Sequence, residues 1–249
     1  MLRTRIIPVL LISDDYIVKT TRFSNPRYIG DPINIVRIFN EKEVDELTLF
    51  DIGIKGKDEI NYNLIKNIAF NARMPICYGG GIRTIAQVEK IFSMGIEKIS
   101  ISKSFILNPI LLSEIASKFG SQSTVVTFDI NRINKDEFCV GGNLICNIEK
   151  IKQLIVQANN SGAGEIIINC IHRDGTDEGY DQDLLDKIYF TAKSPITIVG
   201  GASSLENIFT VAKKYPVIGL GVGNLFIYKG KKKAVLISYP GDHERKLIQ

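Results

Sequence analysis

Short apolar runs alternate along the chain with longer segments in which apolar residues recur every three to four positions. The short runs predict β-strands and the longer segments predict amphipathic helices, an alternation typical of a parallel sheet. The predicted strands are 5–12, 46–51, 75–78, 98–101, 124–130, 165–170, 195–199 and 217–220. The predicted helices are 32–39, 62–70, 84–94, 109–119, 148–159, 183–192 and 205–213, and an eighth helix is harder to find.

An internal repeat favours a closed barrel over an open sheet. Residues 75–81 align with 195–201 at an offset of 120 (195 minus 75), and 45–51 align with 164–170 at 119 (165 minus 46). A repeat near half the chain length, with four strand–helix units in each half, predicts a (β/α)8 TIM barrel made of two half-barrels. An open doubly wound sheet gives no reason for such a repeat. We expect one barrel domain over residues 1–249.

Composition and charge limit the possible partners. Lys and Arg number 31 against 27 Asp and Glu, and this net charge of +4 is too small to indicate nucleic-acid binding but suits an anionic small ligand. No apolar run approaches the roughly 20 residues that span a bilayer, and no secretory signal is recognisable. We therefore expect a cytoplasmic protein with no membrane partner. The spacing of the four cysteines and two histidines predicts no metal site, and we expect no cofactor.

Glycine pairs follow the third and seventh predicted strands, where a barrel places its functional loops. Without Cβ atoms, the backbone there can approach an anion and present N–H groups to it. A single glycine pair after a strand indicates a tight turn about as often as an anion site. The duplication of the pair at half-chain spacing, however, predicts two anion sites, which suit a ligand phosphorylated at both ends. The candidate residues are Gly80 and Gly81 for one site and Asp174, Gly175, Gly200, Gly201, Gly223 and Asn224 for the other.

Asp129 ends the fifth predicted strand, in a run that is otherwise apolar. A carboxylate at this end of a barrel strand points into the mouth, where burial can adjust its pKa for acid–base catalysis. The alternative is a carboxylate that only caps a loop. Asp51 at the end of the second strand is a weaker candidate. Lys19, in the long loop after the first strand, could reach a phosphate, although a lone loop lysine is more often solvated.

Ordered motifs along the chain resemble the HisF family, the cyclase subunits of imidazole glycerol phosphate synthase. They are residues 5–8, 18–19, 30–32, 45–47, 79–83, 119–122, 162–166 and 173–176. The resemblance runs from residue 1 to about 227. It implies a barrel that works with a HisH-like class I glutaminase, whose ammonia enters at the N-terminal end of the barrel.

The resemblance also implies a pair of catalytic aspartates at the ends of the first and fifth strands. Asp129 matches one of them, but Leu11 stands in place of the other, and leucine cannot transfer a proton. Further ligand positions differ from the family pattern: Ser102, Lys103, Asn169, His172 and Val199. Of these, Ser102, Lys103 and Asn169 stay in the implied ligand site, where Lys103 would add a positive charge.

Four charged residues match the family's gate for ammonia, namely Arg5, Glu46, Lys98 and Glu165. Each stands at the start of a predicted strand, so the four side chains can meet at the N-terminal end of the barrel. The alternative is that the ring only stabilises the fold, since this end of a barrel commonly serves stability. The tail from about residue 228 is unlike the family's last helix. It is similar to the HisF-like branch that includes WbuZ and is found with surface-polysaccharide genes.

Three hypotheses follow. The first is a HisF-like subunit that conducts ammonia from a glutaminase toward a sugar, through a separate sugar amidotransferase. The second is the cyclase subunit of histidine biosynthesis, which acts on a bisphosphorylated substrate. The third is a phosphosugar isomerase built on the same half-barrel plan. Leu11 separates the first from the other two, because both of those need the aspartate of the first strand.

Overall fold

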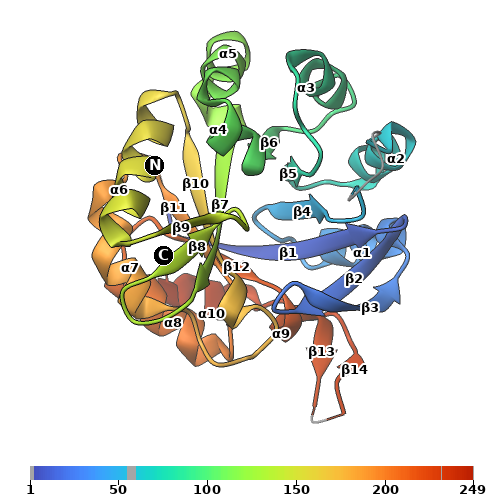
Figure 1. The fold of residues 1–249 in the computed structure, drawn as a ribbon. Coiled ribbons are helices and arrows are strands. Elements are labelled where there is room, and N and C mark those ends of the chain that lie inside the picture. The colour runs from blue at the N-terminus through green and yellow to red at the C-terminus, as the bar shows by residue number, and fades with distance from the viewer. Residues whose placement is uncertain (1–2, 55–59, 231, 249) are drawn as a thin grey trace.

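Eight parallel strands close into a barrel in the computed structural model, which describes residues 3–54, 60–230 and 232–248 (Figure 1). The barrel strands are β1 (Arg5–Ser13), β4 (Leu47–Asp51), β5 (Ile76–Gly79), β6 (Lys98–Ile101), β7 (Thr124–Arg132), β10 (Glu165–Cys170), β11 (Ile196–Val199) and β12 (Gly219–Val222). They pair in the order β10-β11-β12-β1-β4-β5-β6-β7, and β7 pairs with β10 to close the sheet. The predicted (β/α)8 barrel is confirmed.

The outer helices follow the predicted pattern closely. They are α1 (Pro32–Glu41), α2 (Tyr62–Asn71), α3 (Ile85–Phe92), α5 (Pro109–Phe119), α6 (Ile148–Asn160), α7 (Gln182–Ile188) and α8 (Leu205–Lys214), with a short extra helix α4 (Lys103–Leu107) after β6. Local sequence fixes their starts: Asp31 caps α1, with Pro32 as its first residue, and Thr84 forms a capping box with Gln87 at α3. Within the described ranges, no helix is long and apolar enough to cross a bilayer.

Two β-hairpins rise from the C-terminal ends of the strands. The first, β2 (Tyr16–Thr21) with β3 (Ser24–Gly30), follows β1, and the second, β8 (Phe138–Val140) with β9 (Leu144–Cys146), follows β7 (Figure 1). The expectation of a long loop after the first strand is therefore wrong. Asp14 and Asp15 adopt positive φ angles of 48° and 67° and turn β1 directly into β2. Aspartate tolerates this conformation better than most residues.

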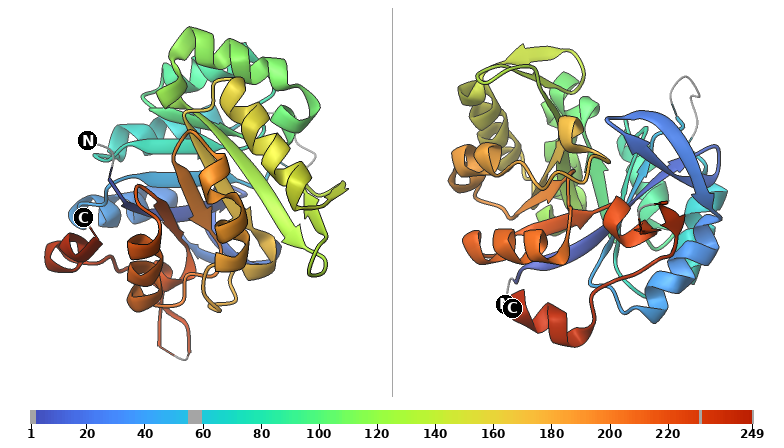
Figure 2. Two further views of the ribbon diagram at one scale, coloured as in Figure 1. Left: turned by 90° about the vertical axis from the view of Figure 1, so that its left-hand side faces the viewer. Right: turned by 90° about the horizontal axis from the view of Figure 1, so that it is seen from below.

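The tail takes the place of a long eighth helix. After the four-residue helix α9 (Asn224–Ile227), the chain forms a small hairpin, β13 (Tyr228–Lys229) with β14 (Ala234–Val235). It then returns along α9, where the amides of Leu236 and Ser238 donate to the carbonyls of Ile227 and Phe226. It ends in α10 (Asp242–Arg245) and a 3-10 turn at Lys246–Ile248, next to the N-terminus (Figure 2).

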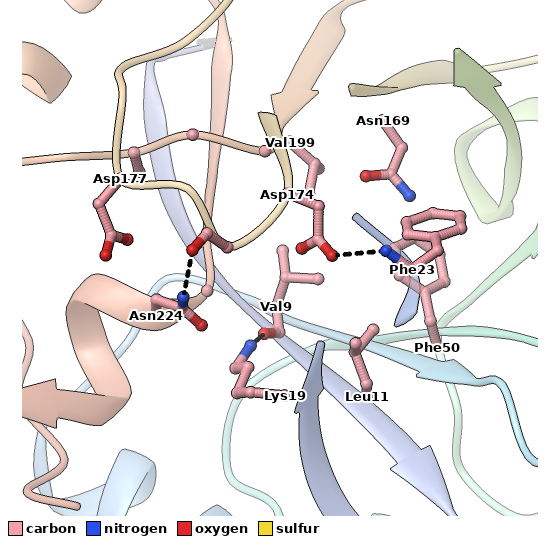
Figure 3. Close-up of a pocket in the computed structure, with 15 residues that line it drawn as sticks. Val9, Leu11, Lys19, Phe23, Phe50, Asn169, Asp174, Asp177, Val199 and Asn224 are labelled. Atoms are coloured by element: carbon pink, nitrogen blue, oxygen red, sulfur yellow. Dashed lines mark hydrogen bonds between the residues drawn. The ribbon is translucent and has the colours of Figure 1, made fainter. Parts of the chain in front are cut away.

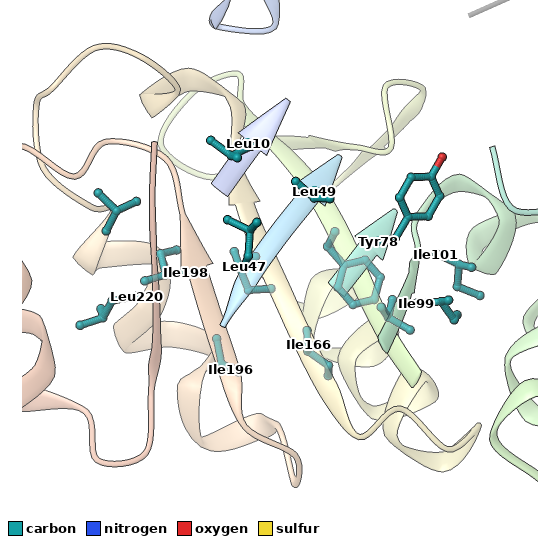
Figure 4. Packing of buried hydrophobic residues seen from close by; sticks show 14 of the residues in the cluster. Leu10, Leu47, Leu49, Tyr78, Ile99, Ile101, Ile166, Ile196, Ile198 and Leu220 are labelled. Atoms are coloured by element: carbon teal, nitrogen blue, oxygen red, sulfur yellow. The ribbon is translucent and has the colours of Figure 1, made fainter. Parts of the chain in front are cut away.

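Alternation along the strands divides the buried residues into two layers. Outward residues such as Leu47, Leu49 and Tyr78 pack beneath the helices in one large apolar cluster (Figure 4). Inward residues form a much smaller cluster inside the barrel, made of Val9, Phe50, Cys77, Val125, Ile167 and Val199. The inward face of β12 is bare backbone, since a Cβ atom on Gly219 would lie 1.8 Å from Oγ1 of Thr197. The interior is thus a narrow column of small side chains.

Candidate functional site

Four charged side chains close a ring across the N-terminal end of the barrel. The Arg5 guanidinium contacts Glu46 at 2.5 Å and Glu165 at 2.9 Å. The Lys98 ammonium contacts the same two carboxylates, each at 2.9 Å. Cations and anions therefore alternate around the ring, and every member touches both neighbours. The structure brings together all four residues that the resemblance assigned to the gate.

Burial and mutual attraction set the charges in this ring. Both glutamates are buried, whereas about a fifth of the Arg5 and Lys98 side chains remains exposed. Burial alone would raise the pKa of Glu165, but Arg5, Lys98 and the hydroxyl of Thr197 hold that pKa below its ordinary value. The two cations in turn have raised pKa values, since the attraction of the carboxylates outweighs burial. Burial and the nearby Glu165 raise the pKa of Glu46, although Lys98 and Arg5 oppose that shift. Each carboxylate thus contacts both cations in a partly dehydrated ring.

Small polar side chains line the column above the ring. Thr48, Ser100, Thr127 and Thr197 are all buried there, and the hydroxyls of Ser100 and Thr127 lie 2.6 Å apart. The Cys77 thiol stays neutral, because burial and the nearby glutamates raise its pKa well above the ordinary value. A column lined by neutral hydroxyl groups offers hydrogen-bond partners to a small uncharged molecule.

At the C-terminal mouth, the carboxylate of Asp129 lies at the end of β7, on the side of the barrel opposite Leu11 of β1. Asp129 accepts hydrogen bonds from Ser102 at 2.9 Å and from Asn169 at 2.8 Å. Burial raises its pKa, and these two donors only partly offset that effect. Leu11 projects into the pocket across from it, together with Val9, Phe50 and Val199 (Figure 3). On the β1 side, the pocket is therefore lined by the apolar side chains of Val9 and Leu11.

Lys19 is not a solvated loop residue, as its position in the sequence had suggested. It lies on β2, it is buried, and its ammonium group donates to the carbonyl oxygen of Val9 at 2.5 Å (Figure 3). Burial lowers its pKa to about 8, although Asp174 opposes that shift. The ammonium group reaches the pocket wall beside Gly223, where a Cβ atom would lie 3.1 Å from Nζ. The pocket thus contains one buried cation beside bare backbone.

The second group of predicted phosphate residues surrounds this cation. Asp174, Gly175, Gly200, Gly201, Gly223 and Asn224 all line the same pocket as Lys19. Several of these glycines are also required by packing: a Cβ on Gly175 would lie 2.4 Å from the Thr20 carbonyl, and one on Gly201 would lie 2.3 Å from the Gly179 carbonyl. The Asn224 amide donates to the Gly175 carbonyl at 3.3 Å and holds the two loops together.

The first group of predicted phosphate residues is more dispersed. Gly80 and Gly81 follow β5 with φ angles of 142° and 66°, and Lys103 is exposed at the start of α4. Asp51 points away from the barrel axis, because the inward positions of β4 are Thr48 and Phe50. Its carboxylate accepts from the Gly53 amide at 3.0 Å and from the Tyr78 hydroxyl at 3.4 Å. The structure does not bring Asp51 together with Asp129.

The hairpin β2–β3 covers the pocket through contacts that its sequence did not indicate. The carboxylate of Asp174 accepts from the Thr20 hydroxyl at 2.7 Å and from the Phe23 amide at 3.2 Å, and Phe23 also lines the pocket. Because these contacts join residues about 150 positions apart, no local motif reveals them.

A second network joins the end of β7 to the start of α7. His172 lies 2.8 Å from Asp181, which also accepts three hydrogen bonds from the Arg132 guanidinium. Burial alone would raise the pKa of Asp181, but His172, Arg132 and the Leu184 amide hold it far below the ordinary value. His172 thus stabilises the loops around the mouth. Within the described part of the chain, no group of three or more His, Cys, Asp or Glu side chains is placed to hold a metal ion.

Comparison with known proteins identifies the family. A family model described as histidine biosynthesis protein matches residues 5–233. A Streptococcus mutans protein named imidazole glycerol phosphate synthase subunit HisF is 33% identical over 92% of each chain. The chain belongs to the HisF family. It is therefore a HisF-type synthase subunit in sequence as well as in fold.

Other HisF relatives are more similar but carry less definite names. A Leptospira borgpetersenii protein, provisionally named imidazole glycerol phosphate synthase subunit HisF, is 46% identical over 100% of this chain and 99% of its own. A Vibrio vulnificus protein, provisionally named imidazole glycerol phosphate synthase subunit hisF3, is 43% identical over 99% and 96% of the two chains. Both are more similar to this chain than the Streptococcus mutans subunit is.

The Lys19 pocket predicts phosphate binding that depends on one ammonium group. In calorimetric titrations with inorganic phosphate at pH 7, Lys19→Met should weaken binding about tenfold or more, since charged hydrogen bonds contribute roughly 1.5–3 kcal/mol. Binding to the native chain should also weaken as the pH rises past about 8, where Lys19 loses its proton. Lys66→Met, an exposed change on α2, is the control. Equal affinity of Lys19→Met and native chain would refute this site.

Asp129 should reduce stability at neutral pH. Its pKa is raised in the folded chain, so stability is lost as the pH rises from the ordinary carboxyl range through that raised value. Asp129→Asn should avoid this loss and raise Tm at pH 7 by roughly 2–4 °C, the shift from about 1 kcal/mol in a domain of this size. Calorimetry at several pH values should show the gain shrinking in acid. The exposed Asp136→Asn is the control, and a gain independent of pH would contradict the assignment.

Proposed function

We propose that this chain conducts ammonia from a HisH-like class I glutaminase, bound at its N-terminal end, toward the amidation of a sugar in surface-polysaccharide biosynthesis. The observation that carries the proposal is the contrast between the two ends of the barrel. The four-charge ring is complete at one end, while at the other end Leu11 lines the pocket at the position where the resemblance to the HisF family implies a catalytic carboxylate.

The ring suits the selection of neutral ammonia. Ammonium would have to lose its water to enter a passage whose charges are already paired, and this costs far more than the passage of an uncharged molecule. A buried ionic ring is also an uncertain source of stability, because desolvation can exceed the Coulombic gain. Its retention beside an altered mouth is better explained by transport than by stability.

The N-terminal end of the barrel also has side chains suited to a protein partner. Phe70 and Phe190 stand at the C-terminal ends of outer helices, which lie at this end of the barrel, and they are 89% and 87% exposed. Leu247 of the tail is 54% exposed near the same end. Large exposed apolar residues commonly mark protein contacts, and we assign them to the glutaminase interface.

In this proposal the C-terminal mouth releases ammonia to an acceptor and does not catalyse the cyclisation of a substrate. A cyclase needs proton transfers on both sides of its substrate, and each contributes about 10²- to 10⁴-fold. Asp129 supplies one carboxylate, and Leu11 supplies none. The Lys19 pocket would hold a phosphorylated ligand or acceptor group, and a separate sugar amidotransferase would complete the reaction.

The second candidate is the histidine-pathway cyclase, which converts ammonia and a bisphosphorylated precursor to imidazole glycerol phosphate and an aminoimidazole carboxamide ribotide. The buried Asp129, with its raised pKa, favours this candidate, because enzymes often raise the pKa of a carboxyl group by burial for general acid–base catalysis. Leu11 counts against it, and so do the provisional names of the more similar relatives.

Direct assay distinguishes these two functions. The purified chain, supplied with ammonia and the histidine-pathway substrate, should turn over at least about 10²-fold more slowly than a cyclase subunit that has both aspartates. Product formation is measured by chromatography, with the Streptococcus mutans protein named imidazole glycerol phosphate synthase subunit HisF as the positive control. Turnover at an ordinary cyclase rate would refute the sugar-amidation proposal and establish the second candidate.

Removing one cation of the ring should reduce the transfer of ammonia from the glutaminase through the barrel. In the complex with glutaminase and amidotransferase, ¹⁵N-amide glutamine competes with excess unlabelled ammonia, and mass spectrometry measures the label in the product. Lys98→Met should lower the labelled fraction about tenfold, equal to about 1.4 kcal/mol, because each carboxylate then keeps only Arg5 as a cationic partner and an excess negative charge faces the passage. Lys98→Glu should have a stronger effect.

Amidation from unlabelled ammonia alone should change little in either variant, since that ammonia enters at the mouth. The exposed Lys150→Met on α6 serves as the matched control. If Lys98→Met lost both activities equally, or if no glutaminase bound the chain, the ring would be structural and the proposal would fail.

A further inference from the structure

The barrel wall has an open seam beside the ring, between the first residues of β1 and the start of β4. The pairing of these strands begins only at Val9 with Thr48, an offset of 39 residues (48 minus 9). If the same register is continued toward the N-terminal end of the barrel, Ile6 lies opposite Asp45. Pro8 lies within this stretch and has no N–H group to donate.

The hydroxyl of Tyr239, from the tail, fills this seam. It donates to the carbonyl of Ile6 at 2.8 Å and accepts from the amide of Asp45 at 3.5 Å, so it links two residues that the register places opposite each other. The Asp45 carboxylate lies 3.4 Å away as a second acceptor. Burial and Asp45 raise the pKa of Tyr239, so the hydroxyl keeps its proton.

The aromatic ring of Tyr239 is itself held on two sides. It packs edge-on against Phe226 at 5.3 Å, and the Arg245 guanidinium lies 5.5 Å from its centre. Arg245 also donates to the carbonyl of Glu43 at 2.6 Å, a residue with a positive φ of 51°. The Asp45 carboxylate receives a further bond from Arg3 at 2.8 Å. The tail and the N-terminal residues thus clamp the segment that leads into β4.

The two residues bridged by Tyr239 are the neighbours in sequence of two ring members. Ile6 follows Arg5, Asp45 precedes Glu46, and Arg5 and Glu46 form the shortest contact of the ring. We propose that Tyr239 is a positioning residue that fixes Arg5 against Glu46 by closing the seam between β1 and β4. This inference rests on the proposed function, in which the ring admits ammonia.

Tyr239→Phe tests the inference, because it removes the hydroxyl and keeps the aromatic packing. Hydrogen exchange followed by mass spectrometry should show faster exchange at the Asp45 amide. In the isotope competition with the full complex, the fraction of product nitrogen derived from glutamine should fall about fivefold, the usual effect of one neutral hydrogen bond. Amidation from free ammonia should stay near its native rate.

Tyr215→Phe is the matched control. Tyr215 is also buried, and its hydroxyl donates to Asp186 at 2.5 Å, but it lies between α7 and α8, outside the ring. The Tyr215→Phe variant should leave the labelled fraction unchanged, even if the Tm of this variant falls as much as the Tm of Tyr239→Phe. Lys98→Met is run in parallel.

The possible outcomes are separable. Unchanged exchange at Asp45 in Tyr239→Phe would overturn the seam assignment. Faster exchange with an unchanged labelled fraction, while Lys98→Met does reduce that fraction, would overturn only the positioning role. If neither Tyr239→Phe nor Lys98→Met altered the labelled fraction, the proposed function itself would fail.

Discussion

The closed barrel forces every second side chain of eight strands into one narrow column, and charges in that column must neutralise one another. Arg5, Glu46, Lys98 and Glu165 satisfy this condition with four contacts of 2.5–2.9 Å. Loss of any one member would leave a carboxylate or cation in a partly dehydrated site without a full set of partners, which is strongly unfavourable. The ring therefore constrains the start of each strand that contributes to it.

The same column relates the two ends of the molecule. Above the ring, buried hydroxyls and small apolar groups leave no further charge until Asp129, Lys19 and Asp174 at the mouth. Each of these three has a hydrogen-bond partner within the chain. The mouth thus pairs the buried carboxylate of Asp129 on β7 with the apolar side chain of Leu11 on β1, while the opposite end of the barrel has a complete ring of alternating charges.

Much of this structure could be predicted from the sequence, because it follows from local periodicity and from the repeat. The eight barrel strands and seven helices depend on nearby residues. The four ring residues are assigned from the resemblance to the HisF family, and their positions at the starts of strands support that assignment. The burial of Lys19 could not be predicted, because it depends on a hairpin held by Asp174, about 150 residues away. The outward direction of Asp51 could have been predicted from strand alternation. Successive side chains of a strand point to opposite faces, and Asp51 lies five positions after Glu46, which is expected to point inward. The tail follows no periodic pattern, and its role depends on contacts with Ile6 and Asp45.

The ring also bears on how a doubled half-barrel can diverge. Glu46 and Glu165 are equivalent in the two halves, but the cations are not, since Lys98 corresponds to Gly219 and Arg5 to Ser123 when the strand registers are superposed. Identical halves that each carried both cations would bury four positive charges against two carboxylates. A duplicated ancestor could therefore retain only one cation in each half. In the present chain both cations, on β1 and β6, come from the first half, so the carboxylates of the ring keep the two-fold symmetry and the cations do not.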